Sequence, residues 1–181
     1  MILTGPAIAQ AVSRGDLTID PFDAGLVNPN SYNYRLGNEL KVALDTPADP
    51  RAEARLETIA LTDQGYLLKP RTVYLGSTVE RIGSDRYVTS LIGRSSLSRL
   101  GCFLQISADL GQLGAVHQWT LEIVVVQPLV VYPGMRVGQV SFWDTAGAAM
   151  PYDGHYGTLS VPSPWSPRAL SGSRHQEEAA A

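Results

Sequence analysis

The sequence contains a single cysteine, Cys102, and only three histidines among its 181 residues. One thiol excludes both an internal disulfide and a metal site built from several thiolates. No apolar run approaches the ~20 residues that span a bilayer, and the N-terminus has no basic segment followed by an apolar one. The sequence therefore predicts a cytoplasmic protein that does not act at a membrane.

Lysine is almost as scarce, with two residues against twelve arginines, and the formal net charge is -3. Nucleic-acid binding is not expected, because that function requires an excess of basic residues. The length fits one domain with a proper core, which we place at residues 1–160. Residues 161–181, rich in proline, serine and alanine, are expected to form a flexible arm and a disordered tail.

Short β-type segments recur at near-regular spacing along the chain, which is typical of an all-β sandwich or barrel. A brief helix is predicted over 6–14, ended by Gly15, and an exposed loop over 45–55. The apolar run 119–126 is expected to be buried on both faces. Residues 130–132 and 135–143, joined by Pro133-Gly134, are expected to form a hairpin. The other expected strands are 32–36, 66–70, 73–79, 86–92 and 102–108.

The segment Gly93–Gly101 concentrates polar chemistry, with two arginines and three serines within the six positions 94–99. Guanidinium groups beside hydroxyls suit an oxyanion or a phosphate. In a helical turn, Ser95, Ser96 and Arg99 are spaced to converge on one ligand. The alternative is a serine N-cap followed by solvated arginines.

Glu122 is the one acidic residue in the apolar run 119–126. Burial would raise the pKa of its carboxyl towards neutrality, which suits a group that carries protons. The alternative is a carboxylate that points to solvent or pairs with an arginine.

Four motifs together resemble the dCTP deaminase branch of the dUTPase-like superfamily. They are Ser31-Tyr32-x-x-Arg35-Leu36-Gly37, Gly93-Arg94-Ser95-Ser96-x-x-Arg99-Leu100-Gly101, Thr120-Leu121-Glu122 and Pro133-Gly134-Met135-Arg136-Val137-Gly138-Gln139. The resemblance implies a β-clip, which is a distorted β-barrel, assembled as a homotrimer with active sites between subunits. It implies hydrolysis of dCTP to dUTP and ammonia with no catalytic cofactor or metal, and with Mg²⁺ accompanying only the substrate phosphates.

The resemblance also assigns roles to individual residues. Glu122 would be the general base and acid, Ser95 and the carbonyl of Ala108 would position the water, and Arg99 would balance charge around Glu122. The zinc-dependent route to the same reaction needs a Pro-Cys-x-x-Cys segment, which a chain with one cysteine lacks. Substrate binding would fall to Arg94, Ser96, Leu97, Ser98, Gln112, Thr120, Leu121, Gln139, Tyr152, His155 and Tyr156.

The chain departs from the family pattern at several positions, three of which bear directly on function. Gln112 stands where relatives carry the aspartate that lies beside the sugar, and glutamine is no base, so we expect little or no dUTPase activity. Asp109 adds a carboxylate near the expected water site, where it would raise the pKa of Glu122 further. His155 replaces a lysine that grips phosphates, which favours weaker triphosphate binding.

Two other functions fit the same residues. One is a specialised paralogue that deaminates a ribo-, mono- or modified cytosine nucleotide in a biosynthetic pathway. The other is a trimer that binds nucleotides without catalysis.

Overall fold

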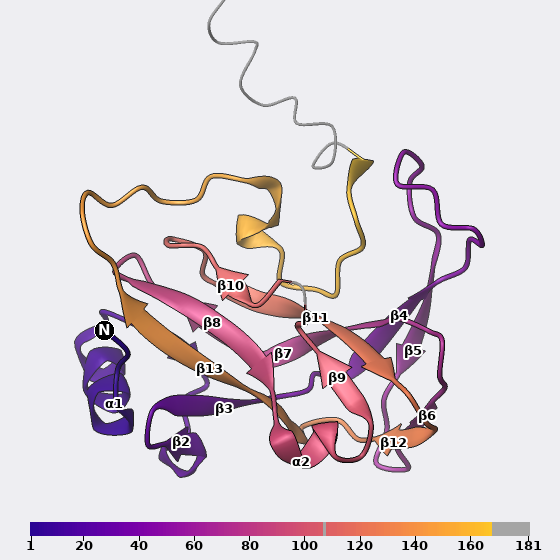
Figure 1. Ribbon diagram of the computed structural model, residues 1–181, viewed down its shortest axis with the longest axis horizontal. Coiled ribbons are helices and arrows are strands. Elements are labelled where there is room, and N and C mark those ends of the chain that lie inside the picture. Colours follow the sequence, from indigo (N-terminus) through magenta and orange to yellow (C-terminus); the bar gives the residue numbers. More distant parts are fainter. Residues whose placement is uncertain (107, 168–181) are drawn as a thin grey trace, which may run out of the picture.

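The structure, a computed structural model, describes residues 1–106 and 108–167. After an N-terminal helix, α1 (Gly5–Arg14), the described chain consists mostly of strands (Figure 1). No helix in the described ranges is long and apolar enough to cross a membrane. The predicted all-β class is confirmed. The remaining elements are β1 (Thr18–Asp20), η1 (Ala24–Leu26), β2 (Val27–Asn28), β3 (Ser31–Arg35), β4 (Glu39–Ala43), β5 (Leu56–Ala60), β6 (Tyr66–Leu68), β7 (Tyr74–Gly83), β8 (Tyr87–Gly93), α2 (Ser95–Ser98), β9 (Cys102–Leu104), β10 (Leu110–Gly111), β11 (His117–Val125), β12 (Leu129–Val131), β13 (Arg136–Asp144) and η2 (His155–Thr158).

Two sheets enclose one hydrophobic core. The larger has the strand order β5-β4-β7-β11-β9, with β1 also paired to β7, and the other has the order β10-β8-β13-β3-β2. Fully buried side chains from both sheets belong to the same cluster, including Tyr32 and Phe142 from the second sheet and Leu40 and Leu121 from the larger one. Apolar burial between the sheets is therefore the main force that holds the two layers together.

Helix α1 forms where the sequence predicts it, one residue earlier than expected. Gly15 adopts φ +78° just after the last turn, and its backbone N–H bonds to carbonyls of that turn, so glycine ends the helix by its conformational freedom. Ile8 and Ala11 are buried, and the helix contacts β2 and β3. Thr4 stands at the N-cap but its side chain makes no capping hydrogen bond.

Two expectations about strands are wrong. Residues 129–131 form β12, which pairs with β6 instead of forming a hairpin with β13. Strand β13 pairs with β3 on one side and β8 on the other, so both its edges are already occupied. Strand β11 is not buried on both faces: Leu121, Ile123 and Val125 face the core, whereas Glu122 is exposed. A mixed burial pattern of this kind is normal in an antiparallel sheet with one solvated face.

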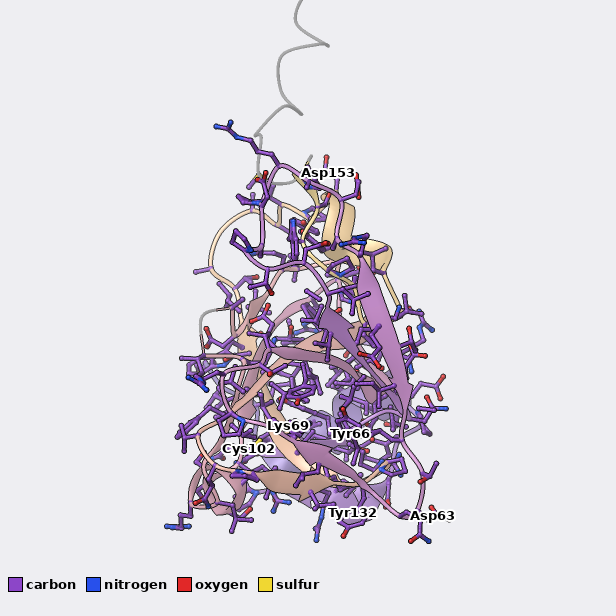
Figure 2. All side chains as sticks on the ribbon, turned by 90° about the vertical axis from the view of Figure 1, so that its right-hand side faces the viewer. Asp63, Tyr66, Lys69, Cys102, Tyr132 and Asp153 are labelled. Atoms are coloured by element: carbon purple, nitrogen blue, oxygen red, sulfur yellow. The ribbon has the colours of Figure 1, made fainter. Side chains whose placement is uncertain are left out.

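The segment after β13 returns across the body of the protein and passes over β10 and β11 (Figure 1). Hydrogen bonds to the body of the protein hold it: the N–H of Tyr152 donates to the Leu113 carbonyl, and Trp165 Nε1 donates to the Ala52 carbonyl. Thr120 Oγ1 donates to the Val161 carbonyl and accepts from the N–H of Ser163. Figure 2 shows Asp153 of this segment at the opposite end of the molecule from Tyr66 and Tyr132. The segment therefore covers one end of the fold, where it adds residues to a cavity. The predicted tail beyond residue 167 lies outside the described residues.

Candidate active site

A cavity of about 460 Å³ lies between the larger sheet and the returning C-terminal segment. Its wall comes from β7 and β11, from the chain between β9 and β11, and from residues 152–165. Such a volume accommodates a ligand the size of a nucleotide. The residues that line it are Leu75, Gln105, Ala108, Leu110, Gln112, Ala115, His117, Trp119, Thr120, Glu122, Tyr152, Tyr156, Leu159, Ser163, Pro164 and Trp165.

An irregularity in β11 directs both odd-numbered and even-numbered residues toward the cavity. The ladder between β11 and β7 shifts register between Gln118 and Thr120, where the N–H of Trp119 donates to the hydroxyl of Thr78 instead of to a ladder carbonyl. Side chains alternate along a regular strand, so odd-numbered and even-numbered residues would face opposite sides. Here Trp119, at the shift, and Glu122, after it, both line the cavity. The irregularity therefore re-aims side chains as β-bulges do beside active sites.

Glu122 supplies the acidic group of the cavity. It pairs across the ladder with Leu75, which also lines the cavity. The carboxyl is accessible from the cavity, yet the surrounding protein atoms remove water from it and raise the pKa of Glu122 above its usual value. This is the direction that the sequence predicts. Asp109 plays no part in the shift, because burial is its cause and the Asp109 carboxylate accepts from the hydroxyl of Ser90.

Gln105 links Glu122 to the carbonyl of Ala108. Its Oε1 accepts from the backbone N–H of Glu122 at 3.0 Å, and its Nε2 donates to the Ala108 oxygen at 3.3 Å. The residue is buried and has φ +52°. The carbonyl that the family resemblance assigns to the water is thus tied to the backbone of the proposed base.

Trp119 and His117 form an aromatic wall. The two rings are 4.3 Å apart between centroids, and Trp119 Nε1 donates to the carbonyl of Ile82 at 2.9 Å. Burial lowers the pKa of His117. Neither residue is predicted from the sequence to belong to the site, since regular alternation places Trp119 on the strand face opposite to Thr120 and Glu122 unless the irregularity is known.

The serine and arginine segment lies elsewhere in this chain. α2 contacts β9, and Leu97 is buried in the core while Arg99 is exposed. Arg99 Nη1 donates to Ser95 Oγ at 3.5 Å, so the one-turn spacing does bring these two side chains together. Neither residue lines the cavity that contains Glu122.

The structure thus divides the predicted site residues into two groups. Those that line the Glu122 cavity are Glu122, Ala108, Gln112, Thr120, Tyr152 and Tyr156. Those that do not line it within one chain are Ser95, Arg99, Arg94, Ser96, Leu97, Ser98, Leu121 and Gln139. Gln139 Oε1 accepts from the hydroxyl of Ser31 at 2.7 Å, on the second sheet. The side chain of His155 is outside the described part of the chain.

Comparisons with known proteins identify the family of the chain. Residues 2–145 match the family model described as dCTP deaminase-like. A protein of Clostridium acetobutylicum named "dCTP deaminase, dUMP-forming" is 39% identical over 147 residues, which are 81% of this chain and 84% of that protein. A Rhodopirellula baltica protein named "dCTP deaminase" is also 39% identical, over 81% of this chain and 74% of its own length.

The fold has a solved counterpart. The crystal structure of a 2'-deoxycytidine 5'-triphosphate deaminase from Agrobacterium tumefaciens superimposes with a TM-score of 0.63 at 25% identity, covering 78% of this chain. This chain spans about half, 47%, of that longer protein. The predicted dUTPase-like fold is confirmed. With the family model matching most of its length, the chain belongs to the dCTP deaminase-like family.

Proposed function

We propose that this protein hydrolyses the amino group from the cytosine ring of dCTP. The observation that carries the proposal is Glu122, a carboxyl whose pKa is raised by burial and which opens into a cavity of nucleotide size. A general base works best when its pKa lies near the operating pH. The names of the relatives, at about two-fifths identity, support dCTP as the substrate.

The proposed chemistry needs one proton carrier. Glu122 removes a proton from water while the water oxygen bonds to C4 of the ring. Glu122 then passes that proton to N3. Glu122 then takes the proton of the new hydroxyl and delivers it to the amino group. The C4–N bond breaks, ammonia leaves, and the ring becomes uracil. Water enters and ammonia departs, so atoms and charge balance without an oxidant or reductant.

Activation of the water by zinc would need several ligands. The described residues contain no group of three or more His, Cys, Asp or Glu side chains able to hold a metal ion. The proposal assigns the activation of water to Glu122, because a carboxyl with a raised pKa suits a general base. Mg²⁺ enters the proposal only as a companion of the substrate phosphates.

We further propose that the product is dUTP and not dUMP. Cleavage of the triphosphate needs a second activated water. Gln112, which lines the cavity at the position where the family resemblance implies an aspartate, has no basic oxygen. Among the described residues that line the cavity, Glu122 is the one acidic side chain. Because a relative is named dUMP-forming, identifying the product as dUTP or dUMP tests this proposal directly.

The test is incubation of the purified protein with dCTP, CTP, dCMP and modified cytosine nucleotides, followed by ammonia assay and anion-exchange separation of products. We expect ammonia from dCTP with dUTP as the accumulating nucleotide. Formation of dUMP and pyrophosphate would contradict the product while supporting deamination. A higher rate with CTP or dCMP would support a specialised paralogue. Absence of ammonia from every substrate would contradict the function.

The site is proposed to be completed by a second copy of the chain. The described residues lining the Glu122 cavity include neither arginine nor lysine, whereas a triphosphate is recognised by cationic donors. Arg94 and Arg99, which flank α2, do not line that cavity. A cytoplasmic homotrimer, in which one subunit offers these arginines to its neighbour's cavity, unites the two groups of residues.

Mixing two inactive variants tests this arrangement. Glu122→Gln and Arg99→Ala chains, each inactive alone, should regain activity when co-expressed in equal amounts. In a cyclic trimer each site then has about a one-in-four chance of receiving both intact residues, so about one quarter of wild-type activity is expected. A mixture as inactive as its components would show that the two residues do not meet between subunits. Separately purified chains mixed without exchange of subunits serve as the control.

A further inference from the structure

Gln105 combines burial of a polar side chain with a backbone conformation that is rare for residues other than glycine. It follows the last residue of β9, the residue is only 5% exposed, and its φ of +52° lies in the left-handed region that non-glycine residues rarely occupy. Strained backbone of this kind persists where surrounding interactions hold it, and it is frequent at functional sites. The amide itself lines the cavity.

Both ends of the amide are used. A backbone N–H only donates and a carbonyl only accepts, so the bonds to Glu122 and Ala108 fix which end of the Gln105 amide is oxygen and which is nitrogen. One lone pair of the Ala108 oxygen is taken by Gln105, and the second is left for another donor. A water donating to that second lone pair would lie on the cavity side, where Ala108 and Glu122 both contribute lining atoms.

We propose that Gln105 is a positioning residue for the deamination reaction: it holds the Ala108 carbonyl at a fixed place relative to Glu122, so that the attacking water is oriented between them. This inference rests on the proposed function. Gln105 touches no reacting atom and acts through its two backbone partners. Its role differs from that of an ordinary buried amide because one partner belongs to the residue that carries the proton.

The side chain that fits this role must accept at one end and donate at the other. Glutamate has the same shape and keeps the acceptor for the Glu122 N–H, but as a carboxylate it presents a second acceptor to the Ala108 oxygen. Protonated glutamate restores the donor. Methionine has a similar length and makes neither hydrogen bond. The two variants Gln105→Glu and Gln105→Met therefore separate hydrogen bonding from packing.

The experiment compares kcat and KM for dCTP in wild type, Gln105→Met and Gln105→Glu across pH 5.5–8.5. Loss of orientation by about 1 Å can cost 10²-fold in rate, so we expect kcat of Gln105→Met to fall by about that factor with a much smaller change in KM. Gln105→Glu should be equally slow at high pH. Its kcat relative to wild type should rise as pH falls, by up to about tenfold per pH unit, as the introduced carboxyl takes up a proton. Loss of packing alone would not produce a recovery of kcat at low pH.

Gln64→Glu is the matched control, because Gln64 is exposed in the turn before β6 and away from the cavity. It should follow the wild-type pH profile. Thermal melting and circular dichroism report whether each variant is folded. Wild-type kcat in Gln105→Met, a pH-independent ratio for Gln105→Glu, or failure of both variants to fold would each overturn the positioning role. Absence of ammonia with the wild type would instead overturn the proposed function itself.

Discussion

Glu122→Gln should reduce the rate of dCTP deamination by about 10²–10⁴-fold, the range that a general acid–base residue contributes. Glutamine keeps the size of the side chain and its hydrogen-bonding atoms, but it neither takes a proton from water nor returns one to the leaving amine. Its backbone N–H still donates to Gln105, so the local geometry is preserved. The measurement is kcat/KM from ammonia release.

The matched control is Glu57→Gln on β5, since Glu57 is exposed and outside the cavity. It should leave the rate unchanged. If Glu122→Gln retained most of the wild-type rate, Glu122 would not be the proton carrier, and the proposed chemistry would be wrong.

The raised pKa of Glu122 also fixes the sign of two pH effects. The folded protein binds this proton more tightly than the unfolded chain, so the contribution of Glu122 to stability falls as pH rises from its ordinary pKa through its higher folded pKa. Over the same interval Glu122 becomes ionised and activity should increase. Wild type should thus lose stability relative to Glu122→Gln as pH rises, while gaining activity. Denaturant midpoints and rate profiles measured in the same buffers test both signs.

The strand that carries Glu122 illustrates what the sequence reveals. An isolated acid in an apolar run was enough to predict both a strand and a carboxyl of raised pKa, because each depends mainly on local composition. The burial of that strand on both faces was wrongly predicted. Glu122 is exposed to the cavity, and only its odd-numbered neighbours face the core. Hydrophobicity alone does not distinguish a fully buried strand from one whose second face lines a cavity.

Long-range contacts explain the other failures. The pairing of β12 with β6 joins segments about sixty residues apart, whereas the adjacent turn at Pro133-Gly134 favoured a local hairpin. Trp119 and Gln105 were not predicted for a similar reason. One reaches the cavity through a register shift against β7, and the other through a positive φ after β9. Neither feature leaves a glycine or proline in the sequence to mark it.

Most of the predicted site residues fall into a group that lines the Glu122 cavity and a group on or beside α2, and local spacing predicts contacts only within each group. Local spacing correctly predicted that Arg99 and Ser95 share a helical turn. In the proposed homotrimer that turn meets the Glu122 of a neighbouring copy, an expectation that comes from the family resemblance and not from local spacing. The complementation experiment therefore tests the part of the site that one folded chain does not determine.

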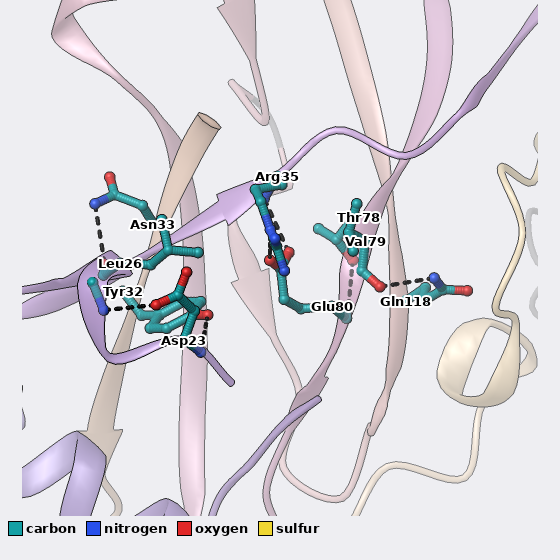
Figure 3. Close-up of polar contacts among 10 residues, drawn as sticks. Asp23, Leu26, Tyr32, Asn33, Arg35, Thr78, Val79, Glu80 and Gln118 are labelled. Atoms are coloured by element: carbon teal, nitrogen blue, oxygen red, sulfur yellow. Dashed lines mark hydrogen bonds and ion pairs between the residues drawn. The ribbon is translucent and has the colours of Figure 1, made fainter. Parts of the chain in front are cut away.

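Arg35→Met should destabilise the protein strongly, by about 3–5 kcal/mol, because it leaves a buried charge without its cation. Glu80 is fully buried, and its two carboxylate oxygens accept from the backbone N–H of Arg35 at 2.9 Å and from its Nε at 2.6 Å (Figure 3). The substitution removes the guanidinium and keeps only the backbone donor. Urea denaturation at constant m-value gives the change in the free energy of unfolding.

Replacing Glu80 instead of Arg35 should destabilise the protein less. In Glu80→Gln the arginine retains access to solvent, since its side chain is 27% exposed, and the loss is expected near that of a hydrogen bond to a charged group, about 1.5–3 kcal/mol. The double variant Arg35→Met with Glu80→Leu removes both charges and should recover much of the stability lost in Arg35→Met. Arg55→Met, which breaks the exposed pair with Asp45, is the control and should match wild type.

This ion pair also supports the site. The hydroxyl of Thr78 donates to the Glu80 carbonyl, and Gln118 Nε2 donates to the Val79 carbonyl (Figure 3). The same Thr78 hydroxyl accepts from the N–H of Trp119. The segment 78–80 thus joins β3 to the irregular part of β11, which aims Trp119 and Glu122 at the cavity. We therefore expect Arg35→Met to lower kcat even where the protein remains folded. Unchanged kcat in folded Arg35→Met would mean that the hydrogen bonds to Thr78 and Val79 hold the irregularity without the ion pair.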